Sequence, residues 1–129
     1  MAEYPETLVF STRHVWAMPN KKKTRAKVGV TDYLLENISE IESIELPMVD
    51  DELEAEAFCI TFHVANGIKQ LRCPLTGRVT DVNQEVLDDP SSLFTDYQAS
   101  WLFEMEVDDV SEFDQLMSGS QYSKYLDSL

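Results

Sequence analysis

The sequence contains little positive charge. Lysine and arginine number 10 against 24 aspartate and glutamate residues, which gives a formal net charge of -14. Nucleic acids and anionic membrane surfaces attract basic proteins, so the composition argues against both as partners. Half of the basic residues lie in one cluster, residues 21–27. We interpret this cluster as a solvated hairpin turn, with a docking patch for an acidic partner as the alternative.

Cysteine is scarce as well. Cys59 and Cys73 are the two cysteines of the chain, too few to build a disulfide framework. No apolar run is long enough to span a bilayer. Residues 1–6 are acidic and polar and lack the features of a secretory signal. We therefore expect a cytoplasmic protein with two reduced thiols.

Motifs that carry chemistry are absent from the sequence. It has no GxSxG, HExxH, P-loop or GxGxxG pattern, and no pair of carboxylates stands out as an acid–base couple. Cys59, Cys73 and His63 do not have the spacing of a zinc site. The sequence therefore predicts a protein without a catalytic site and without a metal site.

What the sequence does contain is a succession of short β-strands. The 129 residues suffice for one domain, 1–129, with a single core. A short early helix is predicted at 31–38 with Thr31 as its N-cap, a helical tail at 110–129, and a loose segment at 1–6. Strands are predicted at 7–10, 15–18, 26–30, 42–46, 57–64, 68–73, 78–83 and 100–107. The pattern indicates a mainly β sandwich or flattened barrel.

Five segments, in order and over nearly the whole chain, resemble the glycine cleavage system H protein family. They are residues 13–16 (RHVW), 28–33 (VGVTDY), 45–52 (ELPMVDDE), 74–83 (PLTGRVTDVN) and 100–102 (SWL). The resemblance implies a barrel-sandwich hybrid, the fold of lipoyl and biotinyl carrier domains. It also implies a hairpin whose tip carries lipoate on a lysine, so that the cofactor and not the protein performs the chemistry.

The family's lysine has no counterpart at the hairpin tip, Val64-Ala65-Asn66-Gly67. Counting forward from Ala57-Phe58 places Ala65 at that position, and counting back from Pro74 places Asn66 there. Neither residue has the primary amine that a lipoyl amide requires. The acidic residue that precedes the lysine in the family is also absent, since Phe62 or His63 stands there.

Lys69 is the only lysine of the hairpin. We interpret it as a solvent-facing strand lysine, with an atypical lipoyl attachment as the alternative. Asn66-Gly67 is a strong hairpin signal. Cys59 and Cys73 flank Asn66 almost symmetrically, so we expect them opposite each other, either as two small buried side chains or as a redox dithiol. Cys59, like Ser39 and Asp50, replaces a family glycine, which predicts altered local packing.

Three functions remain open. The first is a non-lipoylated H-protein-like module, with no cofactor, that binds or regulates protein partners such as glycine-cleavage or lipoate-handling enzymes. The second is a lipoyl carrier with its attachment at Lys69. The third is a thiol redox protein that uses Cys59 and Cys73.

Overall fold

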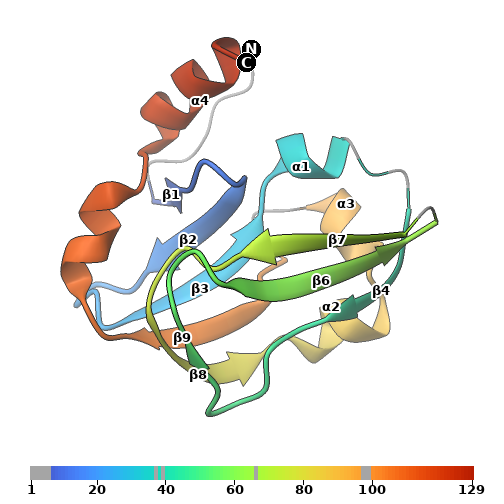
Figure 1. The fold of residues 1–129 in the computed structure, drawn as a ribbon, viewed down its shortest axis with the longest axis horizontal. Coiled ribbons are helices and arrows are strands. Elements are labelled where there is room, and N and C mark those ends of the chain that lie inside the picture. Colours follow the sequence, from blue (N-terminus) through green and yellow to red (C-terminus); the bar gives the residue numbers. More distant parts are fainter. Residues whose placement is uncertain (1–6, 37, 39, 66, 97–99) are drawn as a thin grey trace.

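The computed structural model describes residues 7–36, 38, 40–65, 67–96 and 100–129, and its two antiparallel β-sheets pack against each other (Figure 1). The segment predicted to be loose, residues 1–6, lies outside the described residues. Side chains of both sheets meet in one core, in which Val28 and Met105 of the larger sheet lie in the same cluster as Ile60 and Phe62 of the smaller one. This arrangement confirms the predicted mainly β, two-sheet fold.

The larger sheet has six strands in the order β1-β2-β3-β9-β8-β5. Their bounds are β1 Val9–Phe10, β2 Val15–Pro19, β3 Arg25–Val30, β9 Phe103–Val107, β8 Gly77–Val82 and β5 Glu52–Leu53. The basic residues 21–25 are exposed around the connection between β2 and β3, as the prediction of a solvated turn requires. Asn20 closes this connection, since its Oδ1 accepts hydrogen bonds from the Thr24 and Arg25 amides.

The smaller sheet has three strands in the order β4-β6-β7. They are β4 Ile41–Glu45, β6 Phe58–Val64 and β7 Gly67–Arg72. Ile60 and Phe62 alternate with less buried neighbours and face the core, as the period of two in a strand dictates. Strand β7 is an edge strand and leaves one side of its backbone unpaired.

Three short helices cover the sheets. They are α1 Asp32–Glu36, α2 Gln84–Asp88 and α3 Ser92–Thr95. Helix α1 begins after Thr31, whose Oγ1 accepts a hydrogen bond of 3.3 Å from the Leu34 amide, so the predicted N-cap is confirmed. Among the described residues, no helix is both long and apolar enough to cross a membrane.

The C-terminal tail is helical, as predicted. A 3-10 helix, η1 Val110–Gln115, precedes α4 Gly119–Asp127. Ser118 and Gln121 form a capping box at the start of α4. Tyr122 then packs into a second apolar cluster and stacks on Phe10, with 4.6 Å between the ring centroids. The tail therefore packs against β1 and β2 through this second cluster (Figure 1).

Three local predictions were wrong or incomplete. The last strand was predicted to begin at residue 100 but begins at Phe103. The Leu102 amide nevertheless donates a hydrogen bond to the Val28 carbonyl oxygen of β3. Helix α2 was not predicted. Asn83, whose side chain accepts a hydrogen bond from the Glu85 amide and caps this helix, could have indicated it. Strand β5 was not among the predicted strands, because two residues show no alternation and their pairing with β8 is a tertiary contact.

Candidate functional site

The β6–β7 hairpin is the element that the sequence singled out. Val64 pairs with Gly67, so the two strands join through Ala65 and Asn66. Gly67 is therefore the first residue of β7, one residue before the start of the strand predicted at 68–73. Its φ of 140° is one that side chains rarely adopt, and a Cβ there would meet open space. Asn66 itself lies outside the described residues.

A histidine occupies the approach to the tip. His63 Nε2 lies 2.8 Å from Glu45 Oε2 on the neighbouring strand β4, and both side chains are substantially exposed. The backbone of His63 pairs with Ser43. The resemblance had aligned the family's acidic residue near this position. Here the acidic group comes instead from the adjacent strand and is paired with the histidine.

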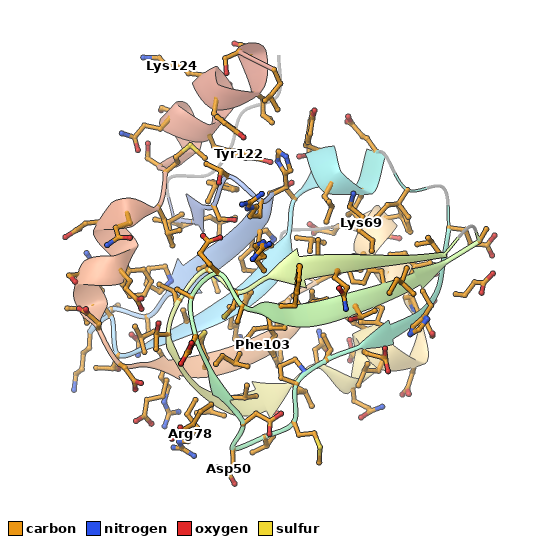
Figure 2. All side chains as sticks on the ribbon, viewed as in Figure 1. Asp50, Lys69, Arg78, Phe103, Tyr122 and Lys124 are labelled. Carbon is orange, nitrogen blue, oxygen red and sulfur yellow. The ribbon has the colours of Figure 1, made fainter. Side chains whose placement is uncertain are left out.

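Lys69 does not project from the tip. Its residue pairs with Phe62 across the hairpin, and paired residues share one face of a sheet. Phe62 and Leu71 are buried on that face, so Lys69 lies on the core-facing side at the exposed rim of β7. Figure 2 shows its side chain between β7 and α1. Lys69 is therefore exposed, as predicted, but its side chain borders a groove.

The groove has a volume of about 350 Å³. It lies between the turn that follows β1, helix α1 and strand β7, and its lining residues are Thr12, Arg13, His14, Leu34, Phe58, Lys69, Gln70, Leu71 and Arg72. Sequence reasoning missed this group of residues. The basic side chains come from two segments far apart in the chain, and neither segment alone carries a binding motif.

His14 is one of the residues that line this groove. Its φ of 67° lies in the left-handed region, in a tight turn where the Ser11 Oγ accepts from the Val15 amide. His14 Nδ1 lies 2.8 Å from the Tyr122 hydroxyl, and its ring packs on Tyr33 with centroids 4.6 Å apart. Burial lowers the pKa of His14, and the nearby charge of Lys69 lowers it further. The imidazole is therefore neutral at physiological pH.

Cys59 and Cys73 are both free thiols and lie close together. The prediction that they pair directly was wrong in detail. The register shifts between Phe58 and Ile60, so Cys59 is the extra residue of a β-bulge. The Cys73 amide donates instead to the Ala57 carbonyl oxygen at 2.8 Å. The altered packing expected from a cysteine in place of a family glycine stays a prediction.

The Cys73 Sγ donates a hydrogen bond of 3.0 Å to the Leu75 carbonyl oxygen. The neighbouring Cys73 thiol raises the pKa of Cys59, which burial raises further, and the neighbouring Cys59 thiol lowers the pKa of Cys73. Cys73 is buried and Cys59 is partly accessible. The arrangement fits a redox dithiol as well as two small core side chains.

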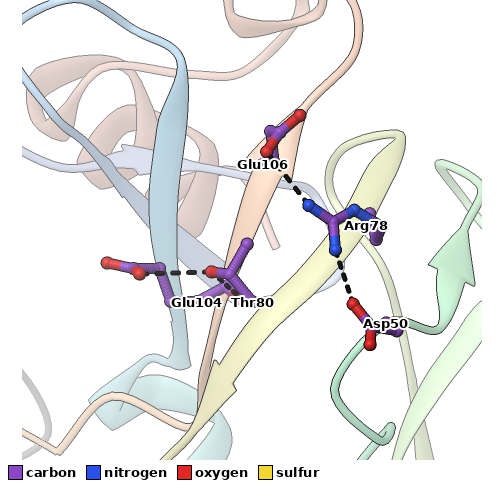
Figure 3. Close-up of polar contacts among 5 residues, drawn as sticks. All are labelled: Asp50, Arg78, Thr80, Glu104 and Glu106. Atoms are coloured by element: carbon purple, nitrogen blue, oxygen red, sulfur yellow. Dashed lines mark hydrogen bonds and ion pairs between the residues drawn. The ribbon is translucent and has the colours of Figure 1, made fainter.

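Asp50, a second replaced family glycine, has a φ of 77°. Aspartate tolerates this left-handed conformation better than most residues do. Figure 3 shows the Arg78 guanidinium between the carboxylates of Asp50 and Glu106. Beside it, Thr80 Oγ1 donates to Glu104. These exposed pairs tie β8 to its neighbours and form no acid–base couple. Ser39, the third replaced glycine, lies outside the described residues.

A metal site was not predicted, and the described part of the chain contains no group of three or more metal-ligating side chains.

The fold and the hairpin define a small β-sandwich of the carrier-domain class. A model of the Glycine cleavage H-protein family matches residues 8–129. The glycine cleavage system H protein of Halalkalibacterium halodurans is 30% identical over 127 residues, with 98% of each chain covered. That of Thermoanaerobacter sp. strain X514 is 34% identical over 125 residues, with 97% of this chain and 98% of the relative covered.

A solved structure agrees with these relatives. The crystal structure of a glycine cleavage system H protein from Mycobacterium marinum superposes with a TM-score of 0.84 at 25% identity, covering 96% of this chain and 99% of that one. The chain therefore belongs to the glycine cleavage H-protein family. Proteins of this family have no catalytic site of their own, and this chain is likewise a carrier-type or binding protein and not an enzyme.

Proposed function

We propose that this protein is a non-lipoylated H-protein scaffold that binds protein partners in the cytoplasm. Its place would be glycine cleavage or lipoate-linked metabolism, where it would bind or regulate enzymes without carrying a group. The observation that supports the proposal is the hairpin register. Val64 pairs with Gly67, and neither of the two residues between them in the sequence, Ala65 and Asn66, has a side-chain amine.

The chemistry of attachment explains why this matters. A lipoyl amide forms on a primary amine, which the methyl group of Ala65 and the carboxamide of Asn66 cannot supply. A swinging arm also needs a site from which it can reach several partner enzymes. Lys69 has the amine, but it lies on the core-facing rim of β7, beside the groove. Its position fits a charged residue that protects an edge strand from pairing with another chain.

Mass spectrometry of the protein from its native source tests the proposal. We expect the intact mass of the unmodified chain after growth with lipoate available. A lipoyl adduct mapped to Lys69 would overturn the proposal and establish the carrier function instead. The Lys69→Arg variant is the control, because it keeps the positive charge and removes the amine.

A second experiment asks whether only the attachment residue is missing. We expect lipoate–protein ligase to modify the Asn66→Lys variant. Its matched control is Asn66→Arg, which has the same charge and a similar length but no primary amine. Modification of Asn66→Lys alone would show that the scaffold is still recognised. If neither variant is modified, the pairing of His63 with Glu45 next to the tip is the first feature to reverse, by His63→Glu.

The thiol pair supports a second candidate function, a redox-active dithiol. With oxidised glutathione as the oxidant, one cysteine thiolate would attack the glutathione disulfide and release one reduced glutathione. The second cysteine would then displace the other, leaving a Cys59–Cys73 disulfide, two reduced glutathiones and no net proton change. We expect a loss of two hydrogens in the intact mass, and only a mixed disulfide in Cys59→Ser. Two thiols that remain fully alkylatable after this treatment would exclude the candidate.

A further inference from the structure

A second groove, which we call the α1–α3 groove, lies between the two short helices α1 and α3. Its lining includes the buried side chains of Leu35 and Leu93 and the ring of Phe94, which is 42% exposed. The volume of the groove is about 360 Å³. An exposed aromatic ring beside an apolar hollow is surface that a second molecule can cover with a gain in free energy.

Every charged side chain that lines the α1–α3 groove is acidic. Asp32 and Glu36 belong to α1, and Asp96 follows the last residue of α3. Among the described residues that line the groove, none is a lysine, an arginine or a histidine. An occupant that matches this surface must therefore combine positive charge with apolar atoms.

The chain itself presents groups of that kind at the connection between β2 and β3. Residues 21–25 are all exposed, and four of the five are basic, namely Lys21, Lys22, Lys23 and Arg25. Among the described residues, none of these four forms an ion pair. Lysine and arginine carry an apolar stem below the charge, and the stem can lie on apolar surface while the charge meets a carboxylate.

This basic turn has a fixed shape before it binds anything. Asn20 Oδ1 accepts hydrogen bonds of 2.9 Å and 3.2 Å from the Thr24 and Arg25 amides. The Asn20 carbonyl oxygen accepts another of 3.1 Å from the Lys23 amide. Because the backbone is already ordered, binding through this turn would cost little backbone entropy.

We propose that the α1–α3 groove binds the basic turn, residues 21–25, of a second copy of this chain. The lysine stems would cover the apolar lining, and their ammonium groups would pair with the carboxylates around it. A cation beside the exposed ring of Phe94 adds a further attraction. The inference goes beyond the proposed function, because it concerns contact between copies and requires neither a partner enzyme nor any statement about lipoylation.

A second copy is favoured as the occupant by the distribution of charge in the chain. Half of the ten basic residues lie in residues 21–27, and the chain has 24 acidic residues, so the turn and the groove are surfaces of opposite sign on one molecule. Figure 1 shows the β2–β3 connection at the left edge and α1 and α3 to the right of the centre. The contact therefore joins different surfaces of the two copies and can repeat from head to tail.

The net charge of -14 keeps this association weak, since whole copies repel each other. At about 0.1 M salt the screening length is about 10 Å, so long-range repulsion is reduced more than attraction between charges in contact. We therefore expect reversible association at that ionic strength and its loss at about 0.5 M salt.

Two-dimensional NMR of the full chain tests the proposal. Spectra are recorded over a dilution series from about 1 mM to about 10 µM, a range that covers weak contacts. We expect concentration-dependent shifts in two separate places, the amides of residues 21–25 and those of Leu35, Leu93 and Phe94. Spectra that do not change with concentration would overturn the proposal.

Charge-reversal variants locate the contact. Lys22→Glu in the turn and Glu36→Lys in the groove should each weaken self-association at least ~10-fold, which corresponds to about 1.4 kcal/mol. The matched controls are Lys124→Glu and Asp127→Lys, which make the same changes of charge at exposed positions of α4. They should leave the association within about twofold of the wild type.

Mixing the two variants gives the sharpest result. The reversed turn of Lys22→Glu fits the reversed groove of Glu36→Lys, and the unchanged turn and groove of the same two chains retain the wild-type contact. We therefore expect an equimolar mixture to associate within about twofold of the wild type, although each variant alone does not. Absence of this rescue, or equal weakening by the α4 controls, would overturn the proposal.

Two other results would also overturn the proposal. Shifts of the groove amides alone that persist at about 0.5 M salt would mean that the apolar grooves of two copies meet each other. Binding of a tetralysine peptide in the groove of a chain that does not self-associate would identify a basic segment of another protein as the occupant. Thermal unfolding of each variant checks that the substitutions leave the fold intact.

Discussion

At the scale of single residues, Tyr122 connects the C-terminal tail to the groove. Its hydroxyl lies 2.8 Å from His14 Nδ1 and 2.9 Å from Thr31 Oγ1, and its side chain is fully buried. The ring stacks on Phe10. One side chain of α4 therefore holds the turn after β1 and the N-terminus of α1, the two elements that border the groove opposite β7.

Replacement of Tyr122 by phenylalanine should keep the stacking and remove the hydroxyl. The buried polar atoms of His14 and Thr31 would each lose a partner, so we expect a loss of about 1–3 kcal/mol in the free energy of unfolding. Urea denaturation measures it. Tyr125→Phe is the control, because the Tyr125 hydroxyl makes an exposed contact of 3.5 Å with the Thr12 carbonyl oxygen. A loss as large in the control would contradict the role of burial.

His14 should make stability depend on pH. Its pKa in the folded state is lowered by burial and by Lys69, so the unfolded chain binds more protons at and below the ordinary histidine pKa of about 6.5. The resulting stability is therefore present above that pH and decreases as the pH falls through it. The groups that face His14 are the charge of Lys69, the Tyr122 hydroxyl and the rings of Tyr33 and Tyr125.

The His14→Asn variant tests this, because asparagine tolerates the φ of 67° at that position. We expect a lower stability overall and a smaller decrease in melting temperature between about pH 7.5 and pH 5.5 than in the wild type. Calorimetry in buffers of matched ionic strength gives the two slopes. Equal slopes of melting temperature against pH in the variant and the wild type would mean that carboxylates, and not His14, cause the pH dependence.

At the scale of secondary-structure elements, two strand positions are occupied by glycine for different physical reasons. A Cβ on Gly77, the first residue of β8, would lie 1.8 Å from the Glu106 carbonyl oxygen of β9. A Cβ on Gly67, the first residue of β7, would meet nothing within 4 Å. The first position is limited by space between strands, and the second by backbone conformation alone.

Gly77→Ala should therefore destabilise the protein more than Gly67→Ala. We expect about 3 kcal/mol or more for Gly77→Ala, since strands β8 and β9 must separate, and about 1 kcal/mol for Gly67→Ala from its positive φ. Chemical denaturation of both variants provides the comparison. Similar losses would indicate that β9 can shift without cost.

The hairpin shows how far the sequence determines an element. Alternation and composition placed β6 and β7 within one residue of their observed starts and ends. The bulge at Cys59 was not predictable, because a single extra residue leaves the alternation of the sequence unchanged while it shifts the partner strand. The relation of Cys59 to Cys73 depended on that shift.

At the scale of the whole molecule, the charge of -14 dominates. The observed ion pairs of the described residues are exposed and contribute little to stability, so repulsion among carboxylates is the larger electrostatic effect. Salt screens this repulsion in the folded state.

We therefore expect the melting temperature to rise, by roughly 2–5 °C, as sodium chloride increases from about 10 mM to about 0.5 M. Differential scanning calorimetry measures the change. The Lys124→Glu variant, which adds to the net negative charge, should show a steeper rise than the wild type. A melting temperature that falls with salt would mean that the exposed ion pairs outweigh the repulsion.

The sequence by itself determined the family, the two-sheet fold and the absence of a lysine from the hairpin tip. It could do so because strand periodicity is local, the family segments keep their order along the chain, and no folding step can supply an amine that the chain does not contain. The tertiary structure alone decided the orientation of Lys69, the bulge that brings the two thiols together, and the basic groove. Each of these depends on strand register or on the meeting of segments far apart in the chain, neither of which a linear pattern records.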